Sequence, residues 1–264
     1  EKYGDATPEA LVESAMTELK YLEDVDFFNI KISVKHSNVP LMIESYRLLA
    51  EKVEYPLHLG VTEAGPLPGG LIKSTAGIST LLNEGIGDTI RYSLTADPIE
   101  EAKSGRQLLE YLGLRERNSL DLIACPSCGR AEVDVIKVAE EAQEALNKED
   151  IPLQVAVMGC VVNGPGEARS ADIGIAAGKN KGHLFIRGEV VRVVNEKDMV
   201  TSLLDEARLI VEEGIESRLA AADDNAAELA QKDVEDLLNS QGDINNFTER
   251  KKSVVEITSK QDND

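Results

Sequence analysis

Three strand-then-helix units follow one another at a constant interval, and this repeat constrains the fold more than any other feature of the sequence. Strand-like runs are expected at 27–35, 56–63 and 89–95. Three charged residues lie at or near the carboxyl ends of these runs, and each step between them is 28 residues: Lys35, Glu63 and Arg91. Strands that alternate with helices across short loops are typical of a parallel sheet covered by helices.

Helical patterns precede and separate these strands. A capping hydroxyl followed by proline (Thr7-Pro8-Glu9) predicts the start of the first helix, and apolar residues follow it at helical spacing. Further helices are expected at 39–53, 71–84 and 98–112, where Gly85 and Gly113 end the last two. The chain is therefore predicted to be an α/β protein in this region.

The repeat interval suits a (β/α)₈ barrel, in which about 250 residues form eight units and function lies at the carboxyl ends of the strands. The three charged residues would then face a ligand, although they could also simply end their strands. Three units cannot close a barrel. Either five units are missing upstream, which the lack of an initiator methionine favours, or the region is a small open α/β sheet, complete as it stands.

The pattern changes near residue 118. Strands are expected at 120–124, 154–159, 172–177 and 183–194, with helices at 131–148 and 198–213. We therefore expect a partial barrel over 1–117, which binds substrate, and a small α+β domain over 118–214. Residues 215–264 hold 12 acidic and 6 basic side chains, and are expected to form an acidic tail with a helix over 219–238 and disorder from 248. We assign the tail no function beyond solubility.

The charge of the chain limits its partners. Its 264 residues include 48 acidic and 28 basic side chains, a formal net charge of −20. This balance disfavours nucleic acid and anionic membrane surfaces. The longest apolar stretch, 153–162, is too short to span a membrane. A small anionic substrate remains possible, because a few local lysines and arginines can make a positive pocket.

The three cysteines form the most informative motif. Cys125 and Cys128 are separated by two residues, and 31 residues lie between Cys128 and Cys160. An odd number of cysteines is a poor disulfide framework, so a reducing, cytoplasmic compartment is expected. All three are predicted at turns or element ends, and the positive end of the helix after Cys128 would stabilise a thiolate. The pattern therefore predicts a metal centre.

Two kinds of metal centre fit the cysteines. Zinc would need a fourth ligand, for which the candidates are His36, His58 and His183, with His183 expected in the same domain. An iron–sulfur cubane could instead take three cysteines and leave one iron open or more weakly bound. Glu167, in the glycine-rich loop after Cys160, is a possible oxygen ligand, although its spacing alone suits an exposed loop carboxylate.

Four motifs, in order along the chain, resemble those of the 4-hydroxy-3-methylbut-2-enyl diphosphate synthase family. They are KISVKHSN (31–38), LGVTEAG (59–65), GIGDTIRYSL (85–94), and the pair CPSCGR (125–130) and MGCVVNGPGE (158–167). The resemblance covers about residues 1–214 and does not extend into the tail. It implies the last three units of a (β/α)₈ barrel followed by a [4Fe–4S] domain.

The resemblance also implies roles for individual residues. Three irons would be held by Cys125, Cys128 and Cys160, and the fourth by Glu167 until substrate replaces it. The barrel residues that match those facing the cyclic diphosphate are Lys35, Glu63, Arg91 and Ser93, and Asn163 matches a residue of the cluster loop near substrate. Glu63 would steer the reaction or donate a proton, or else pair with Lys35 or Arg91. Lys73 and Arg130 are expected to form exposed salt bridges only.

The implied reaction is the reductive ring opening of 2-C-methyl-D-erythritol 2,4-cyclodiphosphate to (E)-4-hydroxy-3-methylbut-2-enyl diphosphate, a two-electron step of isoprenoid biosynthesis. The family implies a homodimer and a flavodoxin or ferredoxin electron donor. Two alternatives stay open: a non-catalytic binding module stabilised by a Cys₃His zinc site, and a chain that binds a cluster but is inactive without its upstream barrel units.

Overall fold

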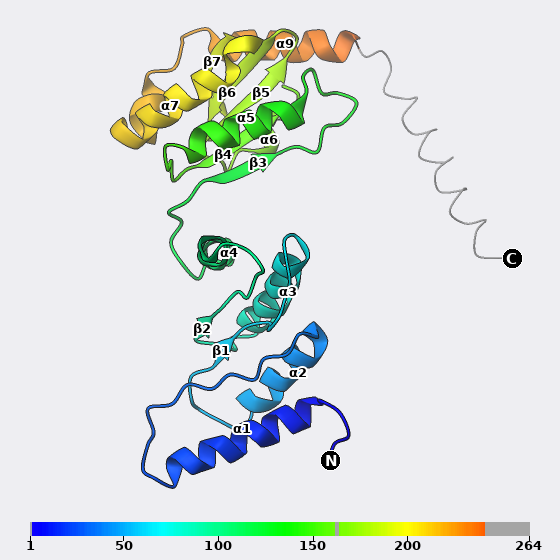
Figure 1. The fold of residues 1–264 in the computed structure, drawn as a ribbon. Helices are drawn as coiled ribbons and strands as arrows, with labels where there is room; N and C mark the ends of the chain where they lie inside the picture. Colours follow the sequence, from blue (N-terminus) through cyan, green and yellow to red (C-terminus); the bar gives the residue numbers. More distant parts are fainter. Residues whose placement is uncertain (1, 162–163, 241–264) are drawn as a thin grey trace, which may run out of the picture. The chain divides into compact units, whose positions relative to one another are not determined.

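The computed structural model describes residues 2–161 and 164–240 of the chain. Contacts divide the chain into two units, residues 1–117 and 118–264, and each is described by itself (Figure 1). Both contain parallel strands and covering helices, so the protein is of the α/β class. None of the helices in the described ranges is long and apolar enough to cross a membrane.

Helices dominate unit 1. Their bounds, with those of two short strands, are α1 (Pro8–Glu23), α2 (Val39–Ala50), β1 (His58–Leu59), α3 (Gly69–Asn83), β2 (Thr89–Ile90) and α4 (Pro98–Tyr111). Side-chain oxygens of Thr7, Asn38 and Asp97 accept hydrogen bonds from backbone N–H groups in the first turns of α1, α2 and α4. Each satisfies a donor that the helix start leaves free, and the predicted helices are confirmed to within a few residues.

The strands of unit 1 are shorter than predicted. β1 and β2 pair in parallel over two residues each, His58 with Thr89 and Leu59 with Ile90. The expectation of a strand over 27–35 is wrong, because this segment contributes only one parallel bridge, between Ile32 and Leu57. The three segments nevertheless lie side by side in chain order and run in the same direction.

The hydroxyl of Tyr46 explains why the first segment is irregular. Tyr46 lies on α2 and is fully buried. Its hydroxyl donates to the carbonyl of His58 at 2.5 Å and accepts from the backbone N–H of Val34 at 3.3 Å. The Tyr46 hydroxyl thus replaces the backbone hydrogen bonds that a regular sheet would form between these two segments at this point. The N–H of Val34 and the carbonyl of His58 both remain paired.

Apolar residues on alternate positions of these segments build the core of unit 1. Ile32, Val34, Leu57 and Leu59 are buried, together with residues of α2 and α3 such as Met42, Leu49 and Ile78. The residues between them along the segments therefore point to the other face of the sheet. One face packs on helices, and the opposite face carries polar side chains.

Unit 2 is built on a five-stranded mixed sheet of order β3-β4-β5-β6-β7. Its elements are β3 (Asp121–Ala124), α5 (Val135–Asn147), β4 (Gln154–Met158), α6 (Gly164–Glu167), β5 (Ile173–Gly178), β6 (Lys181–Ile186), β7 (Glu189–Asn195), the 3₁₀ turn η1 (Glu196–Asp198), α7 (Met199–Glu213), α8 (Ile215–Ala220) and α9 (Ala226–Ser240). The first three strands are parallel, and the last two are antiparallel neighbours.

Two predicted elements of unit 2 are each divided in the structure. The run 183–194, expected as one strand, is the hairpin of β6 and β7, which turns at Arg187 and Gly188 with φ angles of 47° and 85°. The helix expected over 219–238 is broken between α8 and α9. Apolar runs lie on both sides of the turn, so the pattern resembled one strand.

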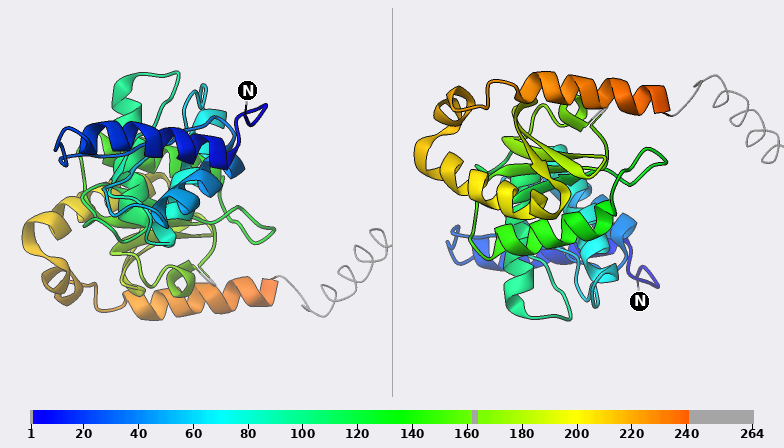
Figure 2. Two further views of the ribbon diagram at one scale, coloured as in Figure 1. Left: turned by 90° about the horizontal axis from the view of Figure 1, so that it is seen from below. Right: turned by 90° about the horizontal axis from the view of Figure 1, so that it is seen from above.

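Helices cover both faces of the sheet in unit 2. α5 and α7 lie on one face, and α9 crosses the opposite face (Figure 2). The first face holds the larger core, which includes Val155, Ile175 and Leu184, and the second holds a smaller cluster around Phe185 and Ala156. Small residues on the second face allow this close packing, since a Cβ on Gly174 would lie 2.3 Å from Cζ of Phe185.

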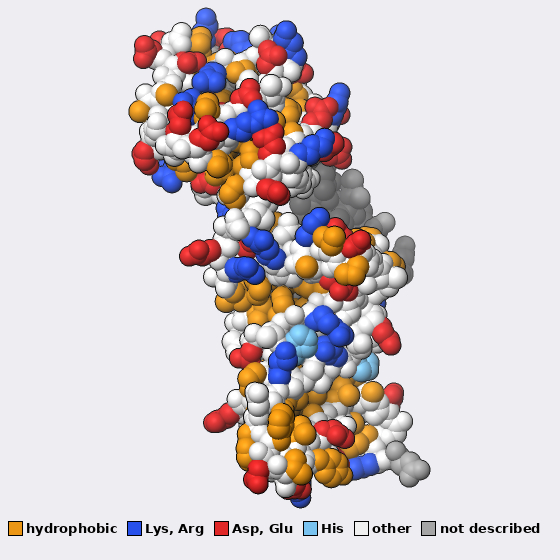
Figure 3. All heavy atoms as spheres, turned by 60° about the vertical axis from the view of Figure 1, so that its left-hand side comes forward, with side chains coloured by type: hydrophobic (Ala, Val, Ile, Leu, Met, Phe, Trp, Pro, Cys, Tyr) orange, Lys and Arg blue, Asp and Glu red, His pale blue; other side chains and the backbone are white. Residues whose placement is uncertain are grey.

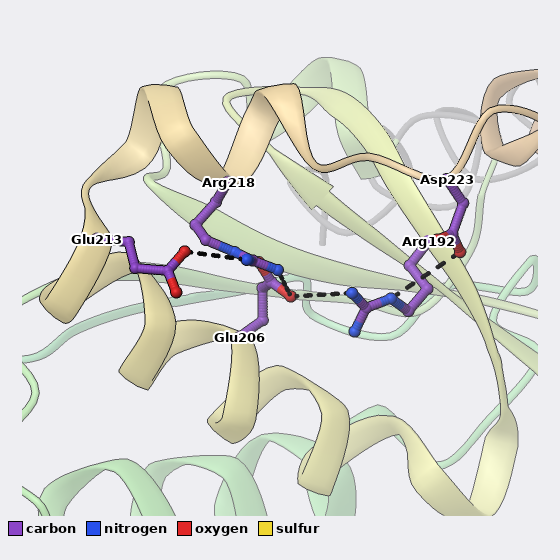
Figure 4. Close-up of polar contacts among 5 residues, drawn as sticks. All are labelled: Arg192, Glu206, Glu213, Arg218 and Asp223. Carbon is purple, nitrogen blue, oxygen red and sulfur yellow. Dashed lines mark hydrogen bonds and ion pairs between the residues drawn. The ribbon is translucent and has the colours of Figure 1, made fainter.

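A buried carboxylate anchors the chain where it leaves α7. Glu206 is 1% exposed and accepts from Nε of Arg218 at 2.7 Å, while Nη2 of Arg192 lies 3.4 Å from the same carboxylate (Figure 4). Arg218 also pairs with Glu213 at 3.1 Å. These contacts fasten α8 to α7 and β7.

A second set of charges anchors α9. Asp233 lies 3.0 Å from Nζ of Lys181 and 2.9 Å from Nε2 of His183, a fully buried residue of β6. Nδ1 of His183 faces the carbonyl of Ala176 at 3.3 Å. The helical part of the predicted tail is therefore packed on the sheet. The expected disorder from 248 onward lies outside the described residues.

Candidate functional site

The polar face of the sheet in unit 1 carries the charged residues that the motifs predict. On the first segment Ile32 and Val34 are buried, whereas Lys31 is exposed and Lys35 is half-buried. On the third segment Arg91 is exposed while its neighbour Tyr92 is buried. The alternation of the strands thus sends these cations to one face.

Gly60 makes room for the side chain of Lys35 beside the backbone of Arg91. A Cβ at Gly60 would lie 3.2 Å from Cε of Lys35 and 2.8 Å from the backbone oxygen of Arg91. The lysine side chain therefore crosses the middle segment and reaches the third. A larger residue at Gly60 would push the lysine away, so glycine is required here by close approach.

The neighbourhood lowers the pKa of Lys35. Burial is the main cause, and the positive charges of Arg91 and Lys31 add to it. Arg91 is held by a hydrogen bond from its Nε to Oγ of Ser93 at 3.0 Å. The structure therefore brings together three of the predicted residues, Lys35, Arg91 and Ser93.

His58 borders the same cations. Its Nδ1 lies 2.7 Å from Oγ1 of Thr89 on β2. Burial lowers the pKa of His58, and the charges of Lys35, Lys31 and Arg91 lower it further, which favours the neutral form of its ring. Figure 3 shows lysine and arginine side chains gathered beside histidine on this face of unit 1.

Glu63 occupies a turn above these residues. Its backbone has φ of 50°, in the left-handed region that a non-glycine residue seldom adopts, and its side chain is exposed. Within the described ranges it forms no ion pair with Lys35 or Arg91. The alternative reading of Glu63 as their charge partner finds no support in this arrangement.

In unit 2, two of the predicted cysteines follow neighbouring strands. Cys125 comes directly after β3, and Cys160 comes two residues after β4, which is parallel to β3. The backbone N–H of Gly159 donates to Sγ of Cys125 at 3.2 Å. A Cβ at Gly159 would lie 3.3 Å from that sulfur and 2.5 Å from Val135, so the missing side chain makes room for the thiol.

Cys128 lies on the loop that follows β3. The loop folds back on the end of β4, because the backbone N–H of Glu132 donates to the carbonyl of Gly159 at 2.9 Å. The pKa of the exposed Cys128 thiol is lowered, chiefly by a hydrogen bond from the backbone N–H of Arg130 and then by its guanidinium. Arg130 therefore acts on the thiol, a role that the sequence analysis did not assign to it.

The predicted source of thiolate stabilisation is wrong. The helix was expected to begin at 131, directly after Cys128, but α5 begins at Val135 and is capped by Asp134, whose side chain accepts from the N–H of Lys137. The Asp134 carboxylate occupies the start of this helix. Local hydrogen bonds from Arg130, rather than the helix end, favour the Cys128 thiolate.

The donor set suits iron–sulfur chemistry better than zinc. All three cysteines are free thiols, and thiolates are the usual ligands of such clusters. In the described ranges no three His, Cys, Asp or Glu side chains are gathered as a metal site. Both ring nitrogens of His183 are engaged by Asp233 and Ala176, so the Cys₃His zinc alternative loses its fourth ligand.

Two predicted site residues cannot be placed. Asn163 lies outside the described residues. Glu167 ends α6, and its side chain is also outside the described part of the structure. Conversely, sequence reasoning missed Lys31 and His58 as neighbours of the site. The i, i+2 spacing of Lys31, Ser33 and Lys35 on one strand face was the available signal.

Comparison with known proteins gives consistent matches along the chain. The GcpE TIM-barrel domain matches residues 1–106, and the GcpE protein C-terminal domain matches residues 121–209. The chain is similar to proteins named 4-hydroxy-3-methylbut-2-en-1-yl diphosphate synthase (flavodoxin). It is 58% identical over 226 residues to that of Acidothermus cellulolyticus, covering 86% of this chain and 57% of the relative.

Other relatives give the same picture. The Corynebacterium glutamicum protein is 58% identical over 220 residues, 83% of this chain and 58% of its own length. A Streptomyces avermitilis protein, whose name adds the number 2, is 56% identical over 223 residues, 84% of this chain and 58% of its own length. The chain therefore spans little more than half the length of these curated relatives.

Proposed function

The chain belongs to the GcpE family, whose two domains match residues 1–106 and 121–209, and from this premise we propose that it forms part of a 4-hydroxy-3-methylbut-2-enyl diphosphate synthase. The reaction is the conversion of 2-C-methyl-D-erythritol 2,4-cyclodiphosphate to (E)-4-hydroxy-3-methylbut-2-enyl diphosphate. It takes up two electrons and two protons, opens the ring and releases one water. The observation that carries the proposal is the position of the Lys35 side chain over Gly60, beside the backbone of Arg91.

The cations on the polar face supply the substrate site. Lys35 and Arg91 have no carboxylate in an ion pair with them within the described ranges, although the chain as a whole is strongly acidic. A diphosphate would relieve their mutual repulsion and accept charge-assisted hydrogen bonds. Ser93 orients the guanidinium of Arg91 for this contact.

Glu63 has the role of handling a proton at the carbon skeleton of the substrate. Its carboxylate is exposed and is carried on a turn held in a left-handed conformation, a kind of backbone strain that is common at functional sites. Asn163 is proposed to contact substrate from the cluster loop, on the family resemblance.

Unit 1 is proposed to be the last three βα units of a (β/α)₈ barrel. The sheet has open edges, and a groove of about 350 Å³ lies between α1 and segment 30–35, while one of about 370 Å³ lies between β2 and α4. These grooves are where strands from the rest of a barrel would pair and pack. Residues 118–214 are proposed as the cluster domain, with 215–264 as its extension.

Cys125, Cys128 and Cys160 are the proposed ligands of a [4Fe–4S] cluster, with Glu167 as a fourth, exchangeable ligand. Bound there, the cluster would supply the electrons and a Lewis-acidic iron for the substrate oxygen. The chain's own contribution is to hold a thiolate at Cys128 through Arg130 and to leave room for Cys125 at Gly159.

The donor of electrons is proposed to be flavodoxin, which the names of the relatives include. Ferredoxin is the other donor that the family resemblance implies. We further propose a homodimer in the cytoplasm, where a reducing environment keeps the three thiols free.

The test of the cluster is iron and sulfide content after anaerobic purification. We expect about four of each per chain, with absorbance near 400 nm. Cys160→Ala should lose more than half of the iron, whereas Ser170→Ala, an exposed serine ten residues later, should retain it. A colourless protein that contains zinc would refute the proposal and restore the binding-module alternative.

The test of activity is anaerobic turnover of the cyclic diphosphate with reduced flavodoxin and, separately, ferredoxin. Residues 1–264 alone are expected to hold iron without turnover. The same residues preceded by the remaining barrel strands of a relative are expected to be active, and Arg91→Met should lower kcat/KM at least tenfold. Undiminished turnover in that variant would remove Arg91 from the site.

A further inference from the structure

The polar face of unit 1 holds a third cation that no motif assigned. Lys31 lies two positions before Ser33 and four before Lys35, on the same side of the strand, and it is exposed. Lys31, Ser33 and Lys35 line the same groove beside α1, and the charge of Lys31 lowers the pKa of both Lys35 and His58. Within the described ranges Lys31 has no carboxylate partner.

Three positive charges gathered without a counterion are unfavourable. Like charges within a Debye length of roughly 8–10 Å repel each other at physiological salt. A chain with 48 acidic residues could readily place one beside them, as it does for Lys181 with Asp233 and for Arg47 with Glu84. Within the described ranges no carboxylate pairs with Lys31, Lys35 or Arg91, which points to an anion as the group that offsets their charge.

His58 supplies a neutral donor beside these charges. If the hydroxyl of Thr89 donates to Nδ1, at their separation of 2.7 Å, the proton of the neutral ring is on Nε2. Nε2–H can then donate to a phosphate oxygen without adding a fourth repelling charge. Thr89 therefore sets the tautomer that binding requires.

We propose that Lys31 is a third anion-binding residue of this site, and that His58, oriented by Thr89, is a positioning residue that donates to the same phosphate group. The inference deepens the proposed function and rests on it for the identity of the substrate. The ligand class is a diphosphate, whose charge of two to three matches three cations.

The first experiment measures inorganic pyrophosphate binding to the 264-residue chain by calorimetry at low salt. We expect Lys31→Met to raise Kd about tenfold, the effect of one charge-assisted hydrogen bond, and Lys31→Arg to restore most of the affinity. Lys73→Met is the matched control, because Lys73 is an exposed lysine of α3 in the same unit. A Kd within twofold of wild type for Lys31→Met, or no binding by the wild-type chain, would overturn the inference.

The second experiment follows the imidazole protons of His58 by NMR as the pH is changed. His36→Gln and His183→Gln assign the remaining resonance among the three histidines of the chain. Pyrophosphate should raise the pKa of His58, because the bound anion offsets the nearby cations. In Lys31→Met the starting pKa should already be higher and the shift smaller. An unchanged His58 titration on saturation with pyrophosphate would exclude His58 from the site.

Failure of the inference and failure of the proposed function give different results. If pyrophosphate binding depends on Lys31 but the barrel-completed protein does not turn over the cyclic diphosphate, the anion site stands and the function falls. If that protein turns over and Lys31→Met leaves KM unchanged, the function stands and Lys31 is not a ligand of the substrate.

Discussion

The two sheets of this protein are both built from alternating strands and helices, but they differ in how many of their faces helices cover. In unit 1 the strands are two residues long, helices cover one face, and the other face carries Lys35 and Arg91. In unit 2 the strands have four to seven residues, and helices cover both faces. A sheet with an open polar face can carry charged side chains along its strands. In a sheet with both faces covered, reactive side chains such as Cys125 lie at the strand ends.

The largest expected effect tests the covered sheet. Phe185 is fully buried, and its ring packs on Gly174. Phe185→Ala should destabilise unit 2 by about 3–5 kcal/mol, because the backbone cannot collapse into the cavity. Urea unfolding resolved by hydrogen exchange would measure this in each unit separately. Phe28→Ala in unit 1 is the control, since Phe28 is 58% exposed, and it should change stability by less than about 0.5 kcal/mol.

The next effect compares a buried ion pair with an exposed one. Glu206→Gln removes the charge that two arginines of unit 2 share in a buried position, and should cost about 3 kcal/mol. Glu84→Gln removes the partner of Arg47 on the surface of unit 1 and should leave the urea midpoint unchanged, because solvent screens that pair. Equal losses of stability in Glu206→Gln and Glu84→Gln would show that burial does not determine how much an ion pair contributes here.

A smaller effect tests the irregular sheet of unit 1. Tyr46→Phe removes the hydroxyl that serves Val34 and His58, and leaves both backbone groups without that partner. We expect a loss of about 1–3 kcal/mol confined to unit 1, read as faster amide exchange at residue 34. Ser79→Ala on α3, outside this contact, is the control. If Tyr46→Phe were neutral, the hydroxyl of Ser33, which donates to the same His58 carbonyl at 2.8 Å, would be a sufficient partner there, and water would have to serve Val34.

The smallest effect is a pH dependence of α9 docking. Burial tends to raise the pKa of Asp233, but hydrogen bonds from Lys181 and His183 outweigh it, so the folded pKa lies below the ordinary value of 3.8. Asp233 therefore stabilises α9 fully above about pH 4, and this contribution is lost as pH falls through the folded pKa. Protection factors of α9 amides, which are corrected for the intrinsic pH dependence of exchange, should fall below pH 4, and Asp233→Asn should show lower protection already at pH 7. An unchanged α9 in Asp233→Asn would contradict this.

Helix starts and charged motifs were readable from the sequence, because their causes are local. Thr7 caps its helix as predicted, and the 28-residue interval placed Lys35, Glu63 and Arg91 at or near the ends of three successive segments. The segment 27–35 could not be read correctly, because its interruption depends on Tyr46, a residue distant in sequence. The β6–β7 turn at Arg187 escaped for another reason: apolar runs lie on both sides of it.

The site was predictable where its residues belong to local sequence motifs. Lys35, Arg91 and Ser93 were named from motifs and lie together. Lys31 was missed although its i, i+2 spacing with Ser33 and Lys35 was a signal, and His58 was missed because only the third dimension brings it to the same face. The effect of Arg130 on the Cys128 thiol also depends on loop conformation rather than on spacing. Metal ligation by the three cysteines stays a prediction.

The docking of α9 has a consequence for synthesis on the ribosome. The strands that lead to Cys125 and Cys160 emerge well before Ala226, the first residue of α9, and domains form from the N-terminal side as the chain grows. Until the last helix arrives, His183 has no carboxylate beside it and one side of the sheet is uncovered. A nascent chain stalled before Ala226 would therefore expose this face of the sheet and be a client for chaperones.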